Sequence, residues 1–151
     1  MDLAALYDAW APRLLAYMTT ITRDRHRAED ALQNLFVKLA TRRPEMRDAG
    51  PYLYRAARNE AISVSRNRPD LPLKDLEILA PAPGSDGAVD PKSLAAALDR
   101  LPPDQSEVVL LHALEGFTFR EVAEILAIPP DTAASRYRYA IEKLQDLMRH
   151  D

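Results

Sequence analysis

The distribution of proline restricts the fold of this chain more than any other feature of its sequence. Of 151 residues, 12 are proline, and several of them cluster between Arg68 and Pro91. The helix breakers in this stretch are Pro69, Pro72, Pro81, Pro83, Gly84 and Gly87. Proline lacks a backbone donor and has a fixed φ, so the stretch continues neither a helix nor an inner strand. We therefore expect residues 68–90 to form a Pro-rich linker between two folded segments, 1–67 and 91–151.

Both flanking segments have a composition that favours helices. The chain has only four glycines, and its apolar residues do not alternate with polar ones as they would in strands. Ala, Leu, Arg and Glu, which are good helix formers, are abundant. The expected fold class is therefore all-α, with two small helical domains joined by the linker.

Start and stop signals predict three helices in the first segment. Apolar residues at helical spacing run through residues 3–21, where Pro12 should bend or divide the helix. Asp24 is the expected cap of a second helix that Pro44 ends. A third helix should begin near Pro51, because proline suits a first helical turn. The expected buried positions of the second and third helices are Ala28, Ala31, Leu32, Leu35, Leu39, Leu53, Ala57, Ala61 and Val64.

The second segment shows comparable signals. A short helix should cover residues 92–100, and a longer one should follow with Asp104 as its cap. Thr118 and Glu121 have the spacing of a capping box that opens a third helix. Asp131 is the expected cap of the last helix. The expected buried stripe of that helix is Ala133, Tyr137, Ala140, Ile141, Leu144 and Met148.

Charge is distributed unevenly along the chain. The formal net charge is only −3, which is unusual for a protein that binds nucleic acid by itself. Residues 1–67 carry 11 Lys/Arg and 8 Asp/Glu, a net of +3, whereas residues 68–90 and 91–151 carry a net of −3 each. Any affinity for nucleic acid is therefore local, or depends on a larger partner.

Several classes of protein are not expected. Without cysteine the chain forms no disulfide, thiolate zinc site or thiol nucleophile. His26, His112 and His150 stand apart, and neither a phosphate-binding glycine loop nor a nucleophile–base pair is apparent, so we expect no enzyme, no metal and no cofactor. No apolar run approaches the ~20 residues of a membrane span, and no secretory signal is visible, so we expect a cytoplasmic protein without membrane insertion.

Residues 119–138 have the pattern of a helix-turn-helix. A short amphipathic helix carries Ala123 where two helices must cross closely, and a tight break follows at residues 127–130. A longer helix then exposes Ser135, Arg136 and Arg138, as a helix that enters the major groove of DNA would do. The residues alone favour DNA binding, and they leave an ordinary helical hairpin with solvated arginines open as the alternative.

Four stretches of the second segment resemble region 4 of the extracytoplasmic-function sigma factors, a family of bacterial RNA polymerase subunits. They are LPPDQSEV at 101–108, LEGFT at 114–118, EVAEIL at 121–126 and TAASR at 132–136. Two stretches of the first segment resemble region 2 of the same family. They are AEDALQNLF at 28–36, which follows the pattern Ala-Glu-Asp-x-x-Gln-x-x-Phe, and YLYRAARN at 52–59. Both matches occur in the family's order and together cover most of the chain.

The resemblance implies that the second helix binds the clamp helices of the largest polymerase subunit. The residues at the matching positions are Glu29, Asp30, Gln33 and Phe36. Glu29, Gln33 and Phe36 lie about one turn apart, off the expected core face, so we expect Phe36 to be exposed. An exposed Phe beside polar residues is typical of a protein-binding surface. Without the resemblance, the residues favour a core position for Phe36.

The resemblance also implies two DNA-binding surfaces. In the family, the loop before the third helix and the helix itself capture the melted −10 promoter element, and region 4 reads the −35 element. Aromatic side chains stack on unpaired bases and arginines hold phosphates. The expected −10 residues are Arg43, Arg47, Tyr52, Arg55, Asn59 and Arg66, and the expected −35 residues are Thr132, Ser135, Arg136 and Arg138. Taken residue by residue, solvated arginines and tyrosines at the edge of the core explain the −10 set equally well.

The chain departs from the family pattern at four positions. Ser63 stands in place of a usual Asp, Asp131 in place of a usual Gly, Ala134 in place of a usual Lys, and Tyr137 in place of a usual Leu. Alanine instead of lysine should weaken contact with phosphate, and Asp131 adds a negative charge near the end of the helix that faces the groove.

The sequence therefore predicts a sigma factor that binds core RNA polymerase and promoter DNA and directs transcription initiation. Because members of the family are commonly held inactive by an anti-sigma factor, such a protein is a further candidate partner. Two alternatives stay open. A helix-turn-helix regulator acting without polymerase would account for residues 104–149, and a helical interaction adaptor that binds no DNA would account for Asp131 and Ala134.

Overall fold

The computed structural model describes residues 2–65 and 91–149, which form helices and contain no strand. The all-α prediction is confirmed. The chain divides into two compact units, Met1–Leu71 and Pro72–Asp151. Arg66 and the expected linker, residues 68–90, lie outside the described residues, so the domain limits at 67 and 91 stay a prediction.

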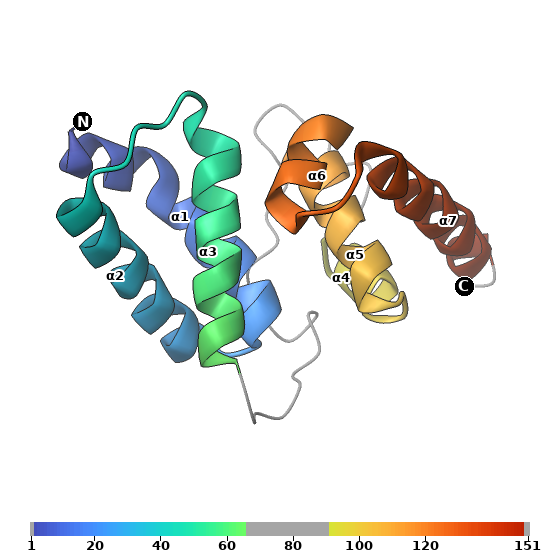
Figure 1. Cartoon of the computed structure of the whole chain (residues 1–151). Coiled ribbons are helices and arrows are strands. Elements are labelled where there is room, and N and C mark those ends of the chain that lie inside the picture. Colours follow the sequence, from blue (N-terminus) through green and yellow to red (C-terminus); the bar gives the residue numbers. More distant parts are fainter. Residues whose placement is uncertain (1, 66–90, 150–151) are drawn as a thin grey trace. The chain divides into compact units, whose positions relative to one another are not determined.

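The first unit is a bundle of three helices, each of which packs against the other two (Figure 1). The helices are α1 (Leu3–Thr22), α2 (Arg25–Arg42) and α3 (Ala49–Val64). The carboxylate of Asp24 accepts hydrogen bonds from the backbone N–H groups of His26 and Arg27, which confirms it as the cap of α2. Arg27 in turn donates from Nη1 to the backbone oxygen of Val64 at 3.0 Å, which satisfies a carbonyl at the end of α3.

Pro12 does not divide α1, which runs without interruption from Leu3 to Thr22. The proline is exposed, on the side of the helix that faces away from the bundle. The opposite side of α1 places Leu14, Tyr17 and Met18 in the core, fully buried.

Phe36 is buried, and the expectation that it is exposed was wrong. Only 8% of the residue is accessible to solvent. The buried positions of α2 include the five expected ones, Ala28, Ala31, Leu32, Leu35 and Leu39, and Phe36 in addition. α2 packs against both α1 and α3, and a helix with two neighbours needs a wider apolar stripe than a helix with one. On α3, Leu53, Ala57 and Ala61 are buried as expected, whereas Val64 is half-buried.

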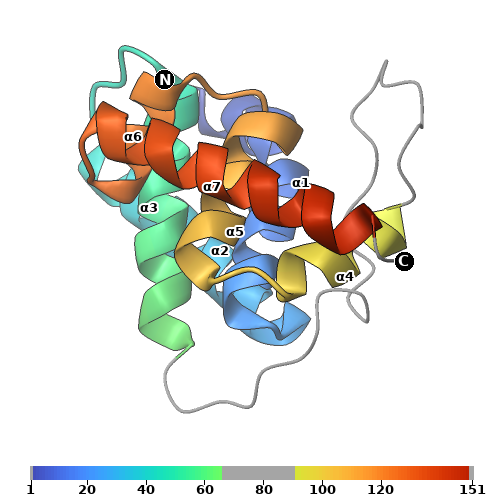
Figure 2. The same cartoon turned by 90° about the vertical axis from the view of Figure 1, so that its right-hand side faces the viewer.

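The second unit contains four α-helices and one π-helical segment within the described residues. They are α4 (Pro91–Asp99), α5 (Pro103–Val109), η2 (Leu110–Leu114), α6 (Phe119–Leu126) and α7 (Pro130–Arg149). α7 packs against α4, α5 and α6 (Figure 2). The expected helices are confirmed with shifts of one or two residues at their ends, and η2 continues α5 before Gly116, at φ 82°, ends the helical run.

One of the three expected caps of this unit is confirmed. The Thr118 hydroxyl accepts from the Glu121 N–H at 3.1 Å, and the Glu121 carboxylate accepts from the Thr118 N–H at 3.0 Å, which completes a capping box. Asp104 and Asp131 are not caps but lie inside the first turns of α5 and α7. The reason is that Pro103 and Pro130 are the first residues of these helices, a position where proline loses no hydrogen bond.

The expected buried stripe of α7 is confirmed except at its end. Ala133, Ala140 and Leu144 are buried, and Tyr137 and Ile141 are half-buried. Met148 is 51% exposed, contrary to expectation. Leu98, Leu101 and Val109 close the core of this unit around the middle of α7.

Candidate functional site

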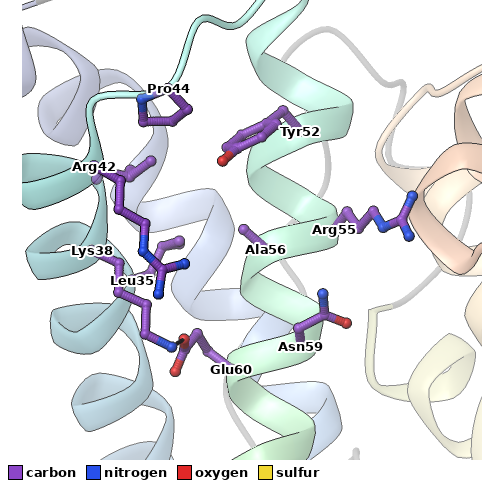
Figure 3. A pocket seen from close by; sticks show the side chains of 10 residues that line it. Leu35, Lys38, Arg42, Pro44, Tyr52, Arg55, Ala56, Asn59 and Glu60 are labelled. Atoms are coloured by element: carbon purple, nitrogen blue, oxygen red, sulfur yellow. Dashed lines mark hydrogen bonds and ion pairs between the residues drawn. The ribbon is translucent and has the colours of Figure 1, made fainter.

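A groove with a volume of about 310 Å³ lies between α2 and α3. Its walls come from both helices, and Pro44 closes one end (Figure 3). The lining residues are Leu35, Lys38, Leu39, Arg42, Pro44, Tyr52, Arg55, Ala56, Asn59 and Glu60. Three of the expected −10 residues, Tyr52, Arg55 and Asn59, are thus brought to one site.

Basic side chains from α2 face an aromatic and an acidic side chain from α3 across this groove. Lys38 and Arg42 extend from α2 toward α3, and Tyr52, which is 41% exposed, lies at the end near Pro44 (Figure 3). The Lys38 ammonium forms an ion pair with the Glu60 carboxylate, whose side chain is only 12% exposed. Arg55 and Asn59 also line the groove, at its edge, and their side chains point from α3 away from α2 (Figure 3). The groove combines an aromatic face with more positive than negative charge.

The loop between α2 and α3 carries two further expected −10 residues. Arg43 has a left-handed backbone, with φ 44°, and its N–H group donates to the Leu39 carbonyl at 2.9 Å, which ends α2. Both Arg43 and Arg47 are exposed, and neither lines the groove, although Arg43 directly precedes Pro44 in the chain. Arg66 cannot be placed, because it lies outside the described residues.

Lys38, Arg42 and Glu60 also line this groove, although none of them is among the −10 residues predicted from the sequence. Lys38 and Arg42 are four residues apart on α2, a spacing that puts two side chains on the same face of a helix. That spacing was visible in the sequence. What it did not indicate was that α3 runs beside this face.

The outer face of α2 carries the expected protein-binding residues. Glu29, Asp30 and Gln33 are exposed, and Glu29 accepts a hydrogen bond from Arg25 Nε at 3.1 Å. Phe36 lies beneath this face and meets Tyr7 of α1 edge to face, with ring centroids 4.9 Å apart. Tyr7 is 47% exposed. The exposed aromatic ring beside this polar row is therefore that of Tyr7.

α6 and α7 form a helix-turn-helix, as the sequence pattern predicts. Ala123 of α6 is buried, and α6 packs against α7. Ala127 has a left-handed backbone, with φ 57°, and the Ile128 N–H group donates to the Ala123 carbonyl at 3.0 Å, so the chain turns directly into α7.

An aromatic cluster fixes the orientation of α7 against α6 and η2. The His112 ring stacks on the Phe119 ring, with centroids 4.1 Å apart, and meets the Tyr137 ring edge to face at 4.7 Å. His112 Nδ1 lies 2.7 Å from the Phe117 carbonyl oxygen. Because a carbonyl only accepts, Nδ1 carries the proton and donates it. Tyr137, which replaces a usual Leu of the family, completes this cluster.

α7 presents a polar and aromatic face along its first half. Thr132 and Ser135 are half-buried, and Arg138 is exposed with its guanidinium 5.4 Å from the centroid of the Tyr139 ring. Tyr139, which is 54% exposed, shares the side of α7 that carries Thr132 and Ser135, because these positions are three or four residues apart. Tyr139 is not among the −35 residues predicted from the sequence.

The fourth expected −35 residue, Arg136, makes an ion pair across the second unit. Its Nε atom lies 3.7 Å from Asp104 Oδ2 of α5. Asp131 is exposed in the first turn of α7, and Ala134 is half-buried, so neither departure from the family pattern disturbs the packing of the helix.

Two further kinds of feature are absent from the part of the chain that the structure describes. No group of three His, Cys, Asp or Glu side chains there is placed to hold a metal ion. No helix in the ranges 2–65 and 91–149 combines the length and apolar character that crossing a membrane requires.

Comparison with protein families agrees with this architecture. Residues 6–68 match the model of "Sigma-70 region 2", and residues 92–144 match that of "Sigma-70, region 4". The fold and these two matches define the chain as a two-unit, helix-turn-helix transcription factor of the sigma-70 class.

Similarity to known sigma factors indicates which group within this class the chain resembles. The chain is 29% identical over 151 residues to the RNA polymerase sigma factor CarQ of Myxococcus xanthus, covering 95% of this chain and 87% of CarQ. It is 27% identical over 150 residues to the extracytoplasmic-function sigma factor EcfG of Rhodopseudomonas palustris strain TIE-1, covering 95% and 83%. The crystal structure of the sigma factor RpoE in complex with the anti-sigma factor NepR from Bartonella quintana has a TM-score of 0.75 and 26% identity, covering 99% of this chain and 98% of RpoE. The chain belongs to the extracytoplasmic-function sigma factors, and it directs promoter recognition by RNA polymerase.

Proposed function

We propose that this sigma factor divides promoter recognition between its two units. The first unit holds polymerase through the outer face of α2 and the melted −10 strand through the groove, and the second unit reads the −35 element through α7. The observation that carries this proposal is the groove between α2 and α3, in which an exposed tyrosine and several basic side chains meet.

The groove suits a single strand of DNA. Unpaired bases stack on aromatic rings, and Tyr52 offers an exposed ring at one end. Lys38, Arg42 and Arg55 supply positive charge for the phosphates, with Glu60 partly neutralising Lys38. Arg43 and Arg47 extend the basic surface along the loop. At about 310 Å³, the groove is at the lower end of the volumes that hold small ligands, as expected for one extruded base rather than a duplex.

Tyr52→Ala tests the groove. The substitution should weaken the binding of holoenzyme to fork-shaped promoter DNA with a single-stranded −10 region by about 1–3 kcal/mol, the range for one stacked base. Binding to fully duplex DNA upstream should stay unchanged. Equal retention of the fork DNA by Tyr52→Ala and by the unaltered protein would exclude stacking on Tyr52.

The outer face of α2 is the proposed polymerase-binding surface. Glu29, Asp30 and Gln33 are exposed along one side of the helix, with Glu29 paired to Arg25 on the same surface. Phe36, buried beneath them against Tyr7, supports the surface from below instead of touching the partner. A partner of this face therefore meets three polar side chains and, beside them, the Tyr7 ring.

A pull-down with core polymerase tests this surface. The triple variant Glu29→Gln, Asp30→Asn, Gln33→Ala changes only exposed side chains, so it should keep its fold and lose most of its retention on immobilised core enzyme. Gln145→Ala, an exposed change on α7, is the matched control. Undiminished retention of the triple variant would remove α2 from the proposed interface.

α7 is the proposed −35 reader. Thr132, Ser135, Arg136 and Arg138 lie in its N-terminal half, the part of a recognition helix that reaches base edges. The net charge of −3 over residues 91–151 is compatible with this role, because polymerase supplies much of the affinity for DNA.

We further propose that an anti-sigma factor binds this chain. We also propose that the chain itself works in the cytoplasm beside RNA polymerase, and that the chain catalyses no reaction of its own. The first proposal is supported by the likeness over 99% of the chain to a sigma factor solved in complex with an anti-sigma factor. The last agrees with the family, whose members are regulatory and non-catalytic.

A further inference from the structure

Arg136 lies at the border between the exposed face of α7 and the helix α5. Figure 2 shows α7 crossing α5, and the two helices are in contact. At the crossing, Arg136 Nε lies 3.7 Å from Asp104 Oδ2. The ion pair thus joins the proposed −35 surface to a neighbouring helix that carries none of the expected DNA-binding residues.

The carboxylate of Asp104 has a defined direction. Its Oδ1 atom accepts a hydrogen bond from the backbone N–H of Gln105 at 3.0 Å, within the first turn of α5. The second oxygen, Oδ2, is therefore the one that faces Arg136. A side chain fixed in this way can hold its partner in one orientation.

The ion pair contributes little to folding. The side chain of Asp104 is 54% exposed and that of Arg136 is 32% exposed, so water screens their attraction. The importance of the contact lies in geometry. A guanidinium has five N–H donors in a rigid fork, and an approach at Nε leaves its two terminal nitrogens, Nη1 and Nη2, for other acceptors.

We propose that Asp104 is a positioning residue for Arg136, holding the guanidinium by its Nε edge so that both terminal nitrogens meet the O6 and N7 atoms of one guanine in the −35 element. This inference rests on the proposed function of α7. Guanine is the base that presents two acceptors side by side in the major groove, and a forked arginine is its usual partner. Lysine in place of Arg136 would lack the fork.

The test is a selection with holoenzyme made from core polymerase and the full-length chain. The probe is a library of duplex DNA in which the region upstream of a constant −10 element is randomised. The unaltered protein should select guanine at one −35 position with a preference of roughly 5- to 150-fold over the other bases, the range for a bidentate contact. Arg136→Ala should abolish that preference, and Arg136→Lys should reduce it strongly.

Asp104→Asn is the decisive variant, because it keeps the shape of the side chain and removes its charge. It should lower the preference for that guanine at least about threefold while leaving the preferences at other −35 positions unchanged. Combined with Arg136→Ala, it should have no further effect, since it acts through Arg136. Thermal unfolding and retention of core polymerase, both expected to be unchanged, separate this result from a loss of structure.

Asp131→Asn is the matched control. It removes the same charge from the first turn of α7, where Asp131 is exposed. It should strengthen binding to all sequences alike, because one repulsion from phosphate is lost, and keep the guanine preference.

Three results would overturn the inference. The first is that Asp104→Asn keeps the full guanine preference. The second is that Asp104→Asn binds the selected sequence more tightly than Asp131→Asn does, because Asp104 would then compete with DNA for Arg136. Arg136→Ala could also leave every −35 preference intact, which would refute the inference while the proposed function stands. If the unaltered holoenzyme selects no −35 sequence, the proposed function of α7 fails, and the inference fails with it.

Discussion

Among single residues, burial separates the aromatic side chains that stabilise the fold from those that are free to bind. Phe36 and Tyr54 are buried, whereas Tyr52 and Tyr139 are about half-exposed. A buried ring contributes mainly through the apolar area and the contacts that it removes from water. Removing an exposed ring beside basic side chains should change the stability of the fold little. We expect its loss to change the binding of DNA instead.

The difference between a buried and an exposed position on α2 can be measured at Phe36 and Gln33. Phe36→Ala should lower the free energy of unfolding by about 3–5 kcal/mol, because it leaves a cavity beneath Tyr7. Gln33→Ala, at an exposed position, should change it by less than about 0.5 kcal/mol. Denaturant unfolding of the two variants checks both values. A small effect of Phe36→Ala would contradict the burial of its ring.

Arg42 is the groove residue whose charge is most directly testable. Arg42→Ala should weaken binding of single-stranded −10 DNA to a similar degree for all sequences, because a phosphate contact carries no base preference. The slope of log affinity against log salt should fall by about 0.7, the value for one phosphate of a single strand. Fluorescence anisotropy over a salt series measures both quantities. Arg149→Ala, an exposed arginine at the end of α7, is the charge-matched control and should change neither.

Individual elements owe their limits to local hydrogen bonds. The capping box at Thr118 starts α6, the left-handed Ala127 ends it, and the aromatic cluster around His112 joins it to α7. These contacts hold the two helices of the helix-turn-helix at a fixed crossing, and a recognition helix must be held in this way to reach base edges.

Loss of the capping box should destabilise the second unit. Thr118→Ala removes the acceptor for the Glu121 N–H group and should lower stability by about 1 kcal/mol. Thr118→Ser keeps an acceptor and should cost much less. Thermal unfolding followed by circular dichroism compares the two. Equal midpoints for both variants would mean that the box does not stabilise α6.

For the whole molecule, the division into two units implies that promoter recognition is shared. Each unit has its own core and its own proposed DNA surface, and the net charges of +3 over residues 1–67 and −3 over residues 91–151 give neither unit a strongly basic character. Two weak contacts joined in one chain bind better than either alone, because the first raises the effective concentration of the second.

Cutting the chain within the expected linker, residues 68–90, tests this sharing. A protease site placed within residues 72–90 of the full-length protein allows cleavage after folding. Cleavage should leave helical content almost unchanged, since both cores stay intact, and should reduce runoff transcription from a −35-dependent promoter by about 10²-fold or more. Transcription that persists at the uncut rate would show that the two units need no covalent connection.

The amino-acid sequence by itself determined the helices, their approximate ends and the family motifs. Helix limits depend on residues within about four positions of one another, as at Asp24 and at Thr118 with Glu121, and such contacts can be read in order along the chain. Two local signals competed at the start of α5, where Asp104 directly follows Pro103. The proline became the first residue of the helix, and Asp104 lies inside the first turn.

The tertiary structure decided what those helices expose and which side chains meet. Phe36 is buried because α2 has two neighbours, and the groove exists because α3 runs beside Lys38 and Arg42. Asp104 reaches Arg136 only because α5 packs against α7. Burial and pairing of this kind depend on residues distant in the sequence, and no local pattern encodes how many neighbours a helix will have.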